Sequence, residues 1–537
     1  MERVAPPRRG VLRELGLAWA CALVLRAVAA GRAESLWPDG VIELEQARAF
    51  AAGRWGEGLA WGFHPLYSLL VAALHALGAP LEGAARGVAV VLSAGVAPAC
   101  GAAAVALLPE AHERPARARQ VALAAGVLAA ALPLLVRLGG QVLAYGPAHL
   151  ALALALLGAL RAAGEGRRAP AWSLLAGAGV GLGYLCRSDA LATGAGLGLA
   201  VAGARGPAGA RATRLLGLAL GLLLTALPYP VALHALTGEW RLSLKKEAGL
   251  LLRTPTPGAP VVPDPAAPLE LWQLVRQEEV GPEPVALAPV PGYPLLDSAW
   301  FAARKLLGAA HPLLALLALA GLGLPLARSP TWPACVPLLG LLGGWVGQTL
   351  LRANYGYTDR IHAAFAGVLL APLSGLGLVL LAGALARRLR TPSAPLRGAL
   401  LAVCLAALVP AALEPQRQGR GRERLLGALL RARAGEGELT VCGRDTRVLA
   451  WHAGARYLDL PPGPPAKALE AARQAGARFL VVHIRWRGGR PGELERALLG
   501  LGLAPALHDE DAREEVRYAW LAWDLGHLGA PETPSRR

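Results

Sequence analysis

Charged residues are scarce in this sequence. They make up 17% of its 537 residues, whereas soluble domains average about 25%. Hydrophobic residues make up 54%, the mean hydropathy is +0.42, and leucine and alanine form long runs. Runs of this kind can cross a bilayer core of roughly 30 Å. The composition therefore argues against an ordinary soluble protein and indicates one that spans a membrane.

Lysine is almost absent. It occurs only at Lys245, Lys246, Lys305 and Lys467, so arginine supplies most of the net charge of +17. The arginines lie mainly between the apolar runs, where the positive-inside rule places them in cytoplasmic loops. We therefore expect this charge to orient the chain in a membrane, and we do not expect nucleic-acid binding.

Several sequence motifs are also absent. The six cysteines contain no CxxC pair, so the sequence indicates neither a zinc site nor a disulfide framework. There is no HExxH, GxSxG or Walker motif. Without a nucleotide-binding loop, an ATP-driven pump is not expected.

The apolar runs predict about eleven transmembrane helices, each of roughly 17–25 residues. They must be helical because hydrocarbon offers backbone groups no hydrogen-bond partner. The expected spans are residues 14–31, 86–108, 120–138, 146–162, 170–186, 188–204, 213–236, 305–327, 331–351, 361–385 and 397–413. We therefore predict an all-α polytopic membrane domain over residues 1–413.

The segment 65–80 is apolar but short, and it contains His75. Counting it as a span would reverse every later loop and move the arginine-rich loops to the outside, against the positive-inside rule. We therefore interpret it as an interfacial helix. The N-terminus is then cytoplasmic, and an odd number of spans places the C-terminus on the extracytoplasmic face of the plasma (inner) membrane.

This topology places three segments on the outer face. They are a first outer loop over 32–85, a proline-rich loop over 237–304, which is either functional or disordered, and the tail. In the tail, residues 418–537, four stretches have the pattern of strands: ELTVCGRD, RYLDL, RFLVVHI and VRYAWLAW. They alternate with two helical stretches, PAKALEAARQAG and GELERALLGLG. That alternation predicts a small extracytoplasmic α/β domain.

The first outer loop contains Asp39 in the turn sequence PDG, before a helix expected from about Val41 to Ala52. Asp39 is a candidate acid–base residue. The alternative is that it only caps this helix, because Asp is a strong N-cap residue. We expect Glu43 and Glu45 to be solvated helix residues.

Two further groups lie at outer ends of spans. Arg187 and Asp189, in GLGYLCRSDALATG, fall at a hairpin apex or in a broken helix, where charges face a cavity or each other; a local surface pair is the alternative. Lys245 and Arg360 lie among outer-face bases that can hold an anionic phosphate. Snorkelling to the interface is the alternative for Lys245.

In this order of motifs the sequence resembles the GT-C superfamily of polytopic glycosyltransferases, most of all the family 39 type, which includes aminoarabinose transferases and protein O-mannosyltransferases. The matching stretches are the outer-loop PDG, HPLYSLL, GLGYLCRSDAL, PYPVALHALTGEWRLSLK and DRIHAAFAGVLLAPL. Many relatives carry an acid just before a proline in the fourth-span region, where this chain has Gly146.

The resemblance implies inverting transfer of a sugar from a polyprenyl-phosphate donor to a lipid, glycan or protein acceptor on the extracytoplasmic side. It implies that Asp39 is the base. The residues expected to hold the donor phosphate are His64, Arg187, Lys245 and Arg360, with Glu45 and Asp189 in support. Some relatives need a divalent metal, but this sequence shows no ligand set that demands one. A secondary transporter or flippase, a scaffold protein and a diverged non-catalytic relative remain as alternatives.

Overall fold

The computed structural model describes most of the chain. The residues that it does not describe are 1–8, 34, 109–112, 165, 245–292, 329–331, 356–359, 416–421, 445, 460–464, 488–506, 514–515 and 526–537. The chain divides into two compact units. The first contains Met1–Ala33, Ile42–Arg253 and Ala288–Gln416, and the second contains Glu34–Val41, Thr254–Leu287 and Arg417–Arg537.

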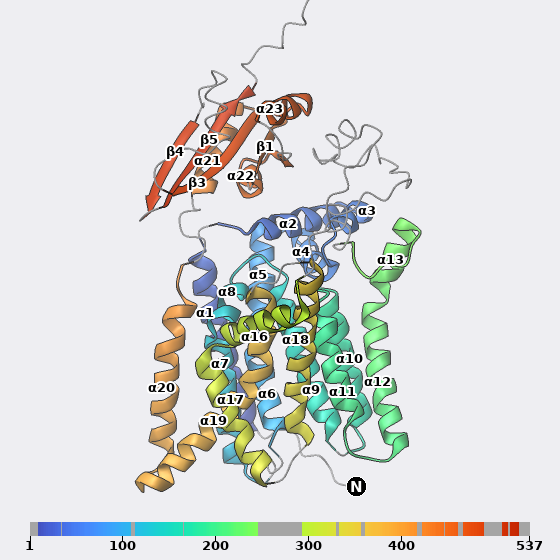
Figure 1. The fold of residues 1–537 in the computed structure, drawn as a ribbon, viewed down its shortest axis with the longest axis vertical. Helices are drawn as coiled ribbons and strands as arrows, with labels where there is room; N and C mark the ends of the chain where they lie inside the picture. Colours follow the sequence, from blue (N-terminus) through green and yellow to red (C-terminus); the bar gives the residue numbers. More distant parts are fainter. Residues whose placement is uncertain are drawn as a thin grey trace, which may run out of the picture. The chain divides into compact units, whose positions relative to one another are not determined.

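The first unit is helical in its described part, with most of its long helices side by side (Figure 1). The helices before the long outer loop are α1 Arg9–Gly31, α2 Pro38–Ala51, which starts in the second unit, α3 Trp55–Ala60, α4 Pro65–Ala76, α5 Leu81–Ala94, α6 Val96–Ala106, α7 Pro115–Ala131, α8 Pro133–Gly139, α9 Tyr145–Ala163, α10 Ala169–Tyr184, α11 Ala190–Ala202, α12 Ala208–Ala226 and α13 Pro228–Thr237. Those after it are α16 Leu295–Ala310, α17 Pro312–Arg328, η1 Trp332–Ala334, α18 Cys335–Tyr355, η2 Arg360–Ala363, α19 Phe365–Leu389 and α20 Ser393–Ala412.

Proline marks several of these helix starts. Pro65, Pro115, Pro133 and Pro228 each open a helix, a position where the missing N–H costs nothing and the fixed φ suits the helix.

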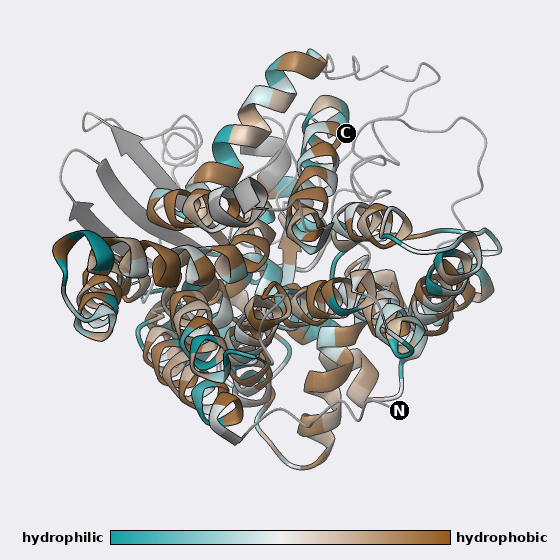
Figure 2. Ribbon diagram, turned by 90° about the horizontal axis from the view of Figure 1, so that it is seen from below, coloured by the Kyte–Doolittle hydropathy of each residue, from teal (hydrophilic) through white to brown (hydrophobic). Residues whose placement is uncertain are grey.

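Most of the ribbon of these helices has the colours of hydrophobic residues, and hydrophilic residues form shorter stretches (Figure 2). Within the described residues, five helical stretches are long and apolar enough to cross a membrane: Leu81–Ala106, Tyr145–Ala163, Ala208–Ala226, Phe365–Leu389 and Ser393–Ala412. Two bent pairs, α7 with α8 at 62° and α16 with the Pro312–Gly323 part of α17 at 93°, raise the number to seven if each pair is counted as one span. A multi-pass membrane fold therefore agrees with the prediction, while the count of eleven spans is not confirmed. The predicted spans at α10 and α11 are helices of only 16 and 13 residues.

Small residues allow the helices to approach closely. A Cβ atom added at Gly177 of α10 would lie 1.9 Å from the backbone oxygen of Leu218, and one added at Gly221 of α12 would lie 2.1 Å from that of Leu174. Such contacts exclude larger side chains and favour van der Waals packing, which drives helix association in lipid.

One arginine is fully buried among these helices. Arg26 of α1 donates to the Ser93 hydroxyl of α5 at 2.6 Å and to the Ala130 backbone oxygen of α7 at 3.1 Å. A charge within a membrane bundle is stable only with such partners, so Arg26 joins three helices.

The described part of the second unit contains a five-stranded sheet in the order β2-β1-β3-β5-β4. Its strands are β1 Thr440–Arg444, β2 Arg456–Asp459, β3 Phe479–Arg487, β4 Leu507–Arg513 and β5 Val516–Asp524. β1 pairs in parallel with β2 and β3, whereas β5 pairs antiparallel with β3 and β4.

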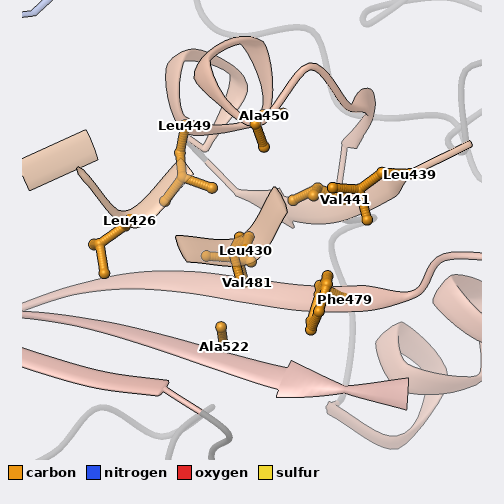
Figure 3. Packing of buried hydrophobic residues seen from close by; sticks show 10 residues of the cluster. Leu426, Leu430, Leu439, Val441, Leu449, Ala450, Phe479, Val481 and Ala522 are labelled. Atoms are coloured by element: carbon orange, nitrogen blue, oxygen red, sulfur yellow. The ribbon is translucent and has the colours of Figure 1, made fainter. Parts of the chain in front are cut away.

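Three helices accompany this sheet: α21 Arg422–Ala434, α22 Arg447–His452 and α23 Pro465–Gln474. Leu426 and Leu430 of α21 pack on Val441, Phe479 and Val481 of the sheet (Figure 3). β1, β2, β3 and β5 lie on the four stretches that the sequence indicates as strands, and β4 was not predicted. The helix predicted in GELERALLGLG lies outside the described residues. The location of this unit on the extracytoplasmic face stays a prediction.

Candidate functional site

Asp39 is an exposed residue in the first turn of α2. The helix begins at Pro38, earlier than predicted, and the N–H of Val41 donates to the Trp37 backbone oxygen at 3.2 Å. Asp39 is therefore the second residue of the helix and does not precede it. The alternative that Asp39 serves only as the N-cap residue of this helix is wrong. A carboxylate in a first turn is still stabilised by the helix dipole.

Glu45, one of the predicted supporting residues, forms an ion pair with Arg48 at 3.1 Å, and its side chain is 30% exposed. This pair lies along one helix, and exposed pairs of this kind contribute little to stability. The partly exposed side chain of Glu45 therefore agrees with the prediction of a solvated helix residue.

Glu43 differs from the prediction. It is only 5% exposed, and its Oε1 atom accepts a hydrogen bond from the N–H of Ala144 at 3.2 Å. The prediction of a solvated side chain is therefore wrong. Glu43 is buried because of a tertiary contact that the local sequence does not show. Its side chain points to the start of α9, where backbone N–H groups lack intrahelical acceptors and favour a negative charge.

A polar clamp holds α2 against the segment that contains His64. The Gln46 amide donates to the backbone oxygens of Gly58 at 3.0 Å and Phe63 at 2.9 Å. The Ser68 hydroxyl of α4 lies 2.7 Å from Gln46 Oε1 and 3.0 Å from the Glu43 backbone oxygen. These bonds fix the backbone immediately before His64.

His64 precedes α4 and is 5% exposed. Its ring centroid lies 5.0 Å from that of Tyr184 and 5.2 Å from that of Tyr229. The N–H of Leu66 donates to the Leu185 backbone oxygen at 2.9 Å. The HPLY segment is thereby joined to the turn between α10 and α11, although the two are about 120 residues apart in sequence.

Arg187 lies in that turn. Its guanidinium carbon lies 3.9 Å from the centroid of the Tyr145 ring, at the start of α9, and its Nη2 atom donates to Asp189 at 2.9 Å. Their side chains are only 17% and 26% exposed. The structure thus contains the local pair that the sequence offered as one interpretation, but the pair is packed against another helix and does not lie free on the surface.

Electrostatics stabilise the charged form of both residues. Burial raises the pKa of the Asp189 carboxyl, but the charge and hydrogen bonds of Arg187 outweigh burial and leave this pKa below its ordinary value. Burial is the largest single effect on the Arg187 guanidinium and lowers its pKa, but the neighbouring groups that favour its charged form, Asp189 first among them, together outweigh burial and leave this pKa above the ordinary value. Asp189 also interacts electrostatically with His362 of η2 and His149 of α9.

Of the other predicted phosphate-binding residues, Arg360 is the first residue of η2. The Arg360 guanidinium donates to the Gly308 backbone oxygen of α16 at 2.7 Å and is exposed. Lys245 lies outside the described residues. The structure therefore brings His64, Arg187 and Asp189 together and adds Glu43, Tyr145 and Tyr184, which the sequence interpretation missed. Only Glu43 offered a signal, since it follows Asp39 by one helical turn.

The described residues contain no group of three His, Cys, Asp or Glu side chains that can hold a metal ion. Gly146 has a packing explanation, because a Cβ atom at this position would lie 2.8 Å from the Ala89 backbone oxygen of α5. No acidic side chain fits there without movement of α5 relative to α9.

Comparison with known proteins gives structural matches only. No family model matches the sequence, and no curated protein matches it. The structure is similar to that of ArnT from Cupriavidus metallidurans bound to undecaprenyl phosphate, with a TM-score of 0.56 and 15% identity over 96% of this chain and 99% of that one. ArnT from the same organism in the apo state gives a TM-score of 0.55 and 13% identity over 94% and 97% of the two chains. The chain therefore has the fold of ArnT, which agrees with the fold that the resemblance in the sequence implies.

Proposed function

We propose that this protein is a membrane glycosyltransferase that moves a sugar from a polyprenyl-phosphate carrier to an acceptor on the extracytoplasmic face. The observation that carries the proposal is the likeness to ArnT over almost the full length of both chains. The ArnT structure is bound to undecaprenyl phosphate, so a lipid phosphate of that chemistry is the donor class that we propose here. The apolar helices agree with a substrate that is delivered within a bilayer.

Arg187 is the residue that we propose as the main ligand of the donor phosphate. A guanidinium is planar, permanently charged and matched to a phosphate in geometry. The Tyr145 ring supports one face of Arg187, and Asp189 fixes its orientation. A group held from two sides loses little conformational entropy on binding. His64, Lys245 and Arg360 complete the proposed set of phosphate-binding residues.

The proposed reaction is a single displacement. Asp39 takes the proton of the acceptor group, and the acceptor atom attacks the anomeric carbon of the sugar. The bond between that carbon and the carrier phosphate breaks, and the phosphate leaves with the bonding electron pair. Positive side chains stabilise the charge that develops on the phosphate. Attack opposite the leaving group inverts the anomeric configuration.

Lipid-linked sugar profiling of a strain that lacks the gene tests this proposal. We expect the polyprenyl-phosphate sugar that serves as donor to accumulate, and we expect wild-type protein, but not Asp39→Asn, to return it to its normal level. An unchanged lipid profile together with transport of a solute by the purified protein would contradict the proposal and favour a secondary transporter.

A further inference from the structure

Glu43 is a buried acid for which the proposed reaction has no role. It is 5% exposed, and burial of a carboxylate is costly unless hydrogen bonds and nearby positive charge compensate. Its Oε1 atom accepts from Ala144, the residue that precedes the first residue of α9. Ser68 of α4 also donates to its backbone oxygen. The carboxylate is therefore fixed at the N-terminus of α9, where the helix dipole compensates its charge.

The next residue along the chain is Tyr145, whose ring supports the Arg187 guanidinium. The bond from Glu43 to Ala144 thus fixes the backbone that presents this ring. The negative charge of Glu43 also favours the charged guanidinium of Arg187, as a smaller effect than those of Asp189 and Tyr145. Glu43 therefore influences Arg187 by packing through Tyr145 and by charge.

From these contacts we propose that Glu43 is a positioning residue that holds Arg187, through Tyr145 and the start of α9, in the orientation that binds the phosphate of a lipid-linked donor. This inference rests on the proposed function. Glu43 itself does not contact the donor, and it determines affinity for the phosphate group rather than for the polyprenyl chain.

The test measures binding of undecaprenyl phosphate and of undecaprenol, which lacks the phosphate, to the full-length protein by native mass spectrometry in detergent. Glu43→Gln keeps the side-chain shape and an acceptor oxygen but removes the charge. We expect its Kd for undecaprenyl phosphate to rise about tenfold, the scale of one charge-assisted hydrogen bond, while undecaprenol binding is unchanged. The matched control is Glu57→Gln, since Glu57 pairs with Arg54 on the exposed side of α3 and should bind both lipids like wild type.

A double-variant comparison shows whether Glu43 acts through Arg187. In the Arg187→Gln background, Glu43→Gln should cause little further loss. If Glu43→Gln lowers the melting temperature strongly, Tyr145→Leu tests the same route without altering the carboxylate, and it should also weaken binding of the phosphate form alone. Equal losses for both lipids, fully additive losses, or wild-type binding by Glu43→Gln would each overturn the inference. Failure of the wild-type protein to bind undecaprenyl phosphate would overturn the proposed function and this inference with it.

Discussion

Arg187 is held between the ring of Tyr145, 3.9 Å from its guanidinium carbon, and the carboxylate of Asp189, 2.9 Å from its Nη2 atom. Tyr145 belongs to α9, whereas Asp189 belongs to the same turn as Arg187. One contact therefore fixes the guanidinium relative to another helix, and the other fixes it relative to its own turn. This arrangement leads to the predictions below.

Arg187→Lys should raise the KM for the lipid-linked donor about 10- to 100-fold, because an ammonium cannot reproduce the planar, bidentate donor set of a guanidinium. The measurement is steady-state transfer at varied donor concentration in reconstituted membranes. Arg54→Lys is the control, because Arg54 pairs with Glu57 and is half-exposed. An unchanged KM in Arg187→Lys would remove Arg187 from the phosphate site.

Asp189→Asn should destabilise the protein by about 1 kcal/mol, because it removes the charge that pairs with a largely buried guanidinium. The lowered pKa of Asp189 fixes the pH dependence. A carboxyl with a lowered native pKa stabilises the fold above its unfolded pKa of about 3.9, and this contribution is lost as the pH falls through the lower native value.

Thermal unfolding of wild type and Asp189→Asn in detergent at several pH values checks this prediction. The difference in melting temperature should be constant from about pH 8 to pH 5 and should narrow below about pH 4. A difference that grows toward acid pH would contradict the assigned direction.

Within the second unit, the Ser35 hydroxyl donates to the carboxylate of Glu423 in α21, and both residues are fully buried. Ser35 lies four residues before Asp39. Ser35→Ala should therefore cost about 1–3 kcal/mol, because it leaves a buried carboxylate with one fewer partner.

Loss of this bond should also lower kcat more than it changes the donor KM, because it loosens the segment that contains Asp39 and leaves the phosphate-binding residues intact. Glu436→Gln is the control, since Glu436 is an exposed residue after α21. Equal effects of Ser35→Ala and Glu436→Gln on kcat would show that this bond does not position Asp39.

Gly146→Ala should destabilise the protein by about 1–3 kcal/mol through overpacking, because the new Cβ atom meets the Ala89 backbone oxygen at 2.8 Å. Gly87→Ala in the neighbouring α5 is the matched control, since nothing lies within 4 Å of a Cβ atom there. The control should be neutral or stabilising because Ala favours helix over Gly. Equal melting temperatures for the two variants would contradict the packing explanation of Gly146.

The sequence predicted the helical membrane fold because a long apolar run in a bilayer forms a helix, which satisfies its own backbone hydrogen bonds. It also indicated the Arg187–Asp189 pair, because the two residues are only two positions apart. It did not predict the burial of Glu43, since this depends on Ala144, which lies about 100 residues away. Spans such as α10 and α11 are harder to count, because their helices are shorter than their apolar runs.

The role of Asp39 as the base is the central claim of the proposed reaction. The most direct measurement is transfer of sugar from the donor that accumulates in the deletion strain, by purified wild type and Asp39→Asn in reconstituted membranes. Asp39→Asn should lose transfer by at least about 100-fold while it binds undecaprenyl phosphate with wild-type affinity. Transfer at a rate near that of wild type would contradict the account.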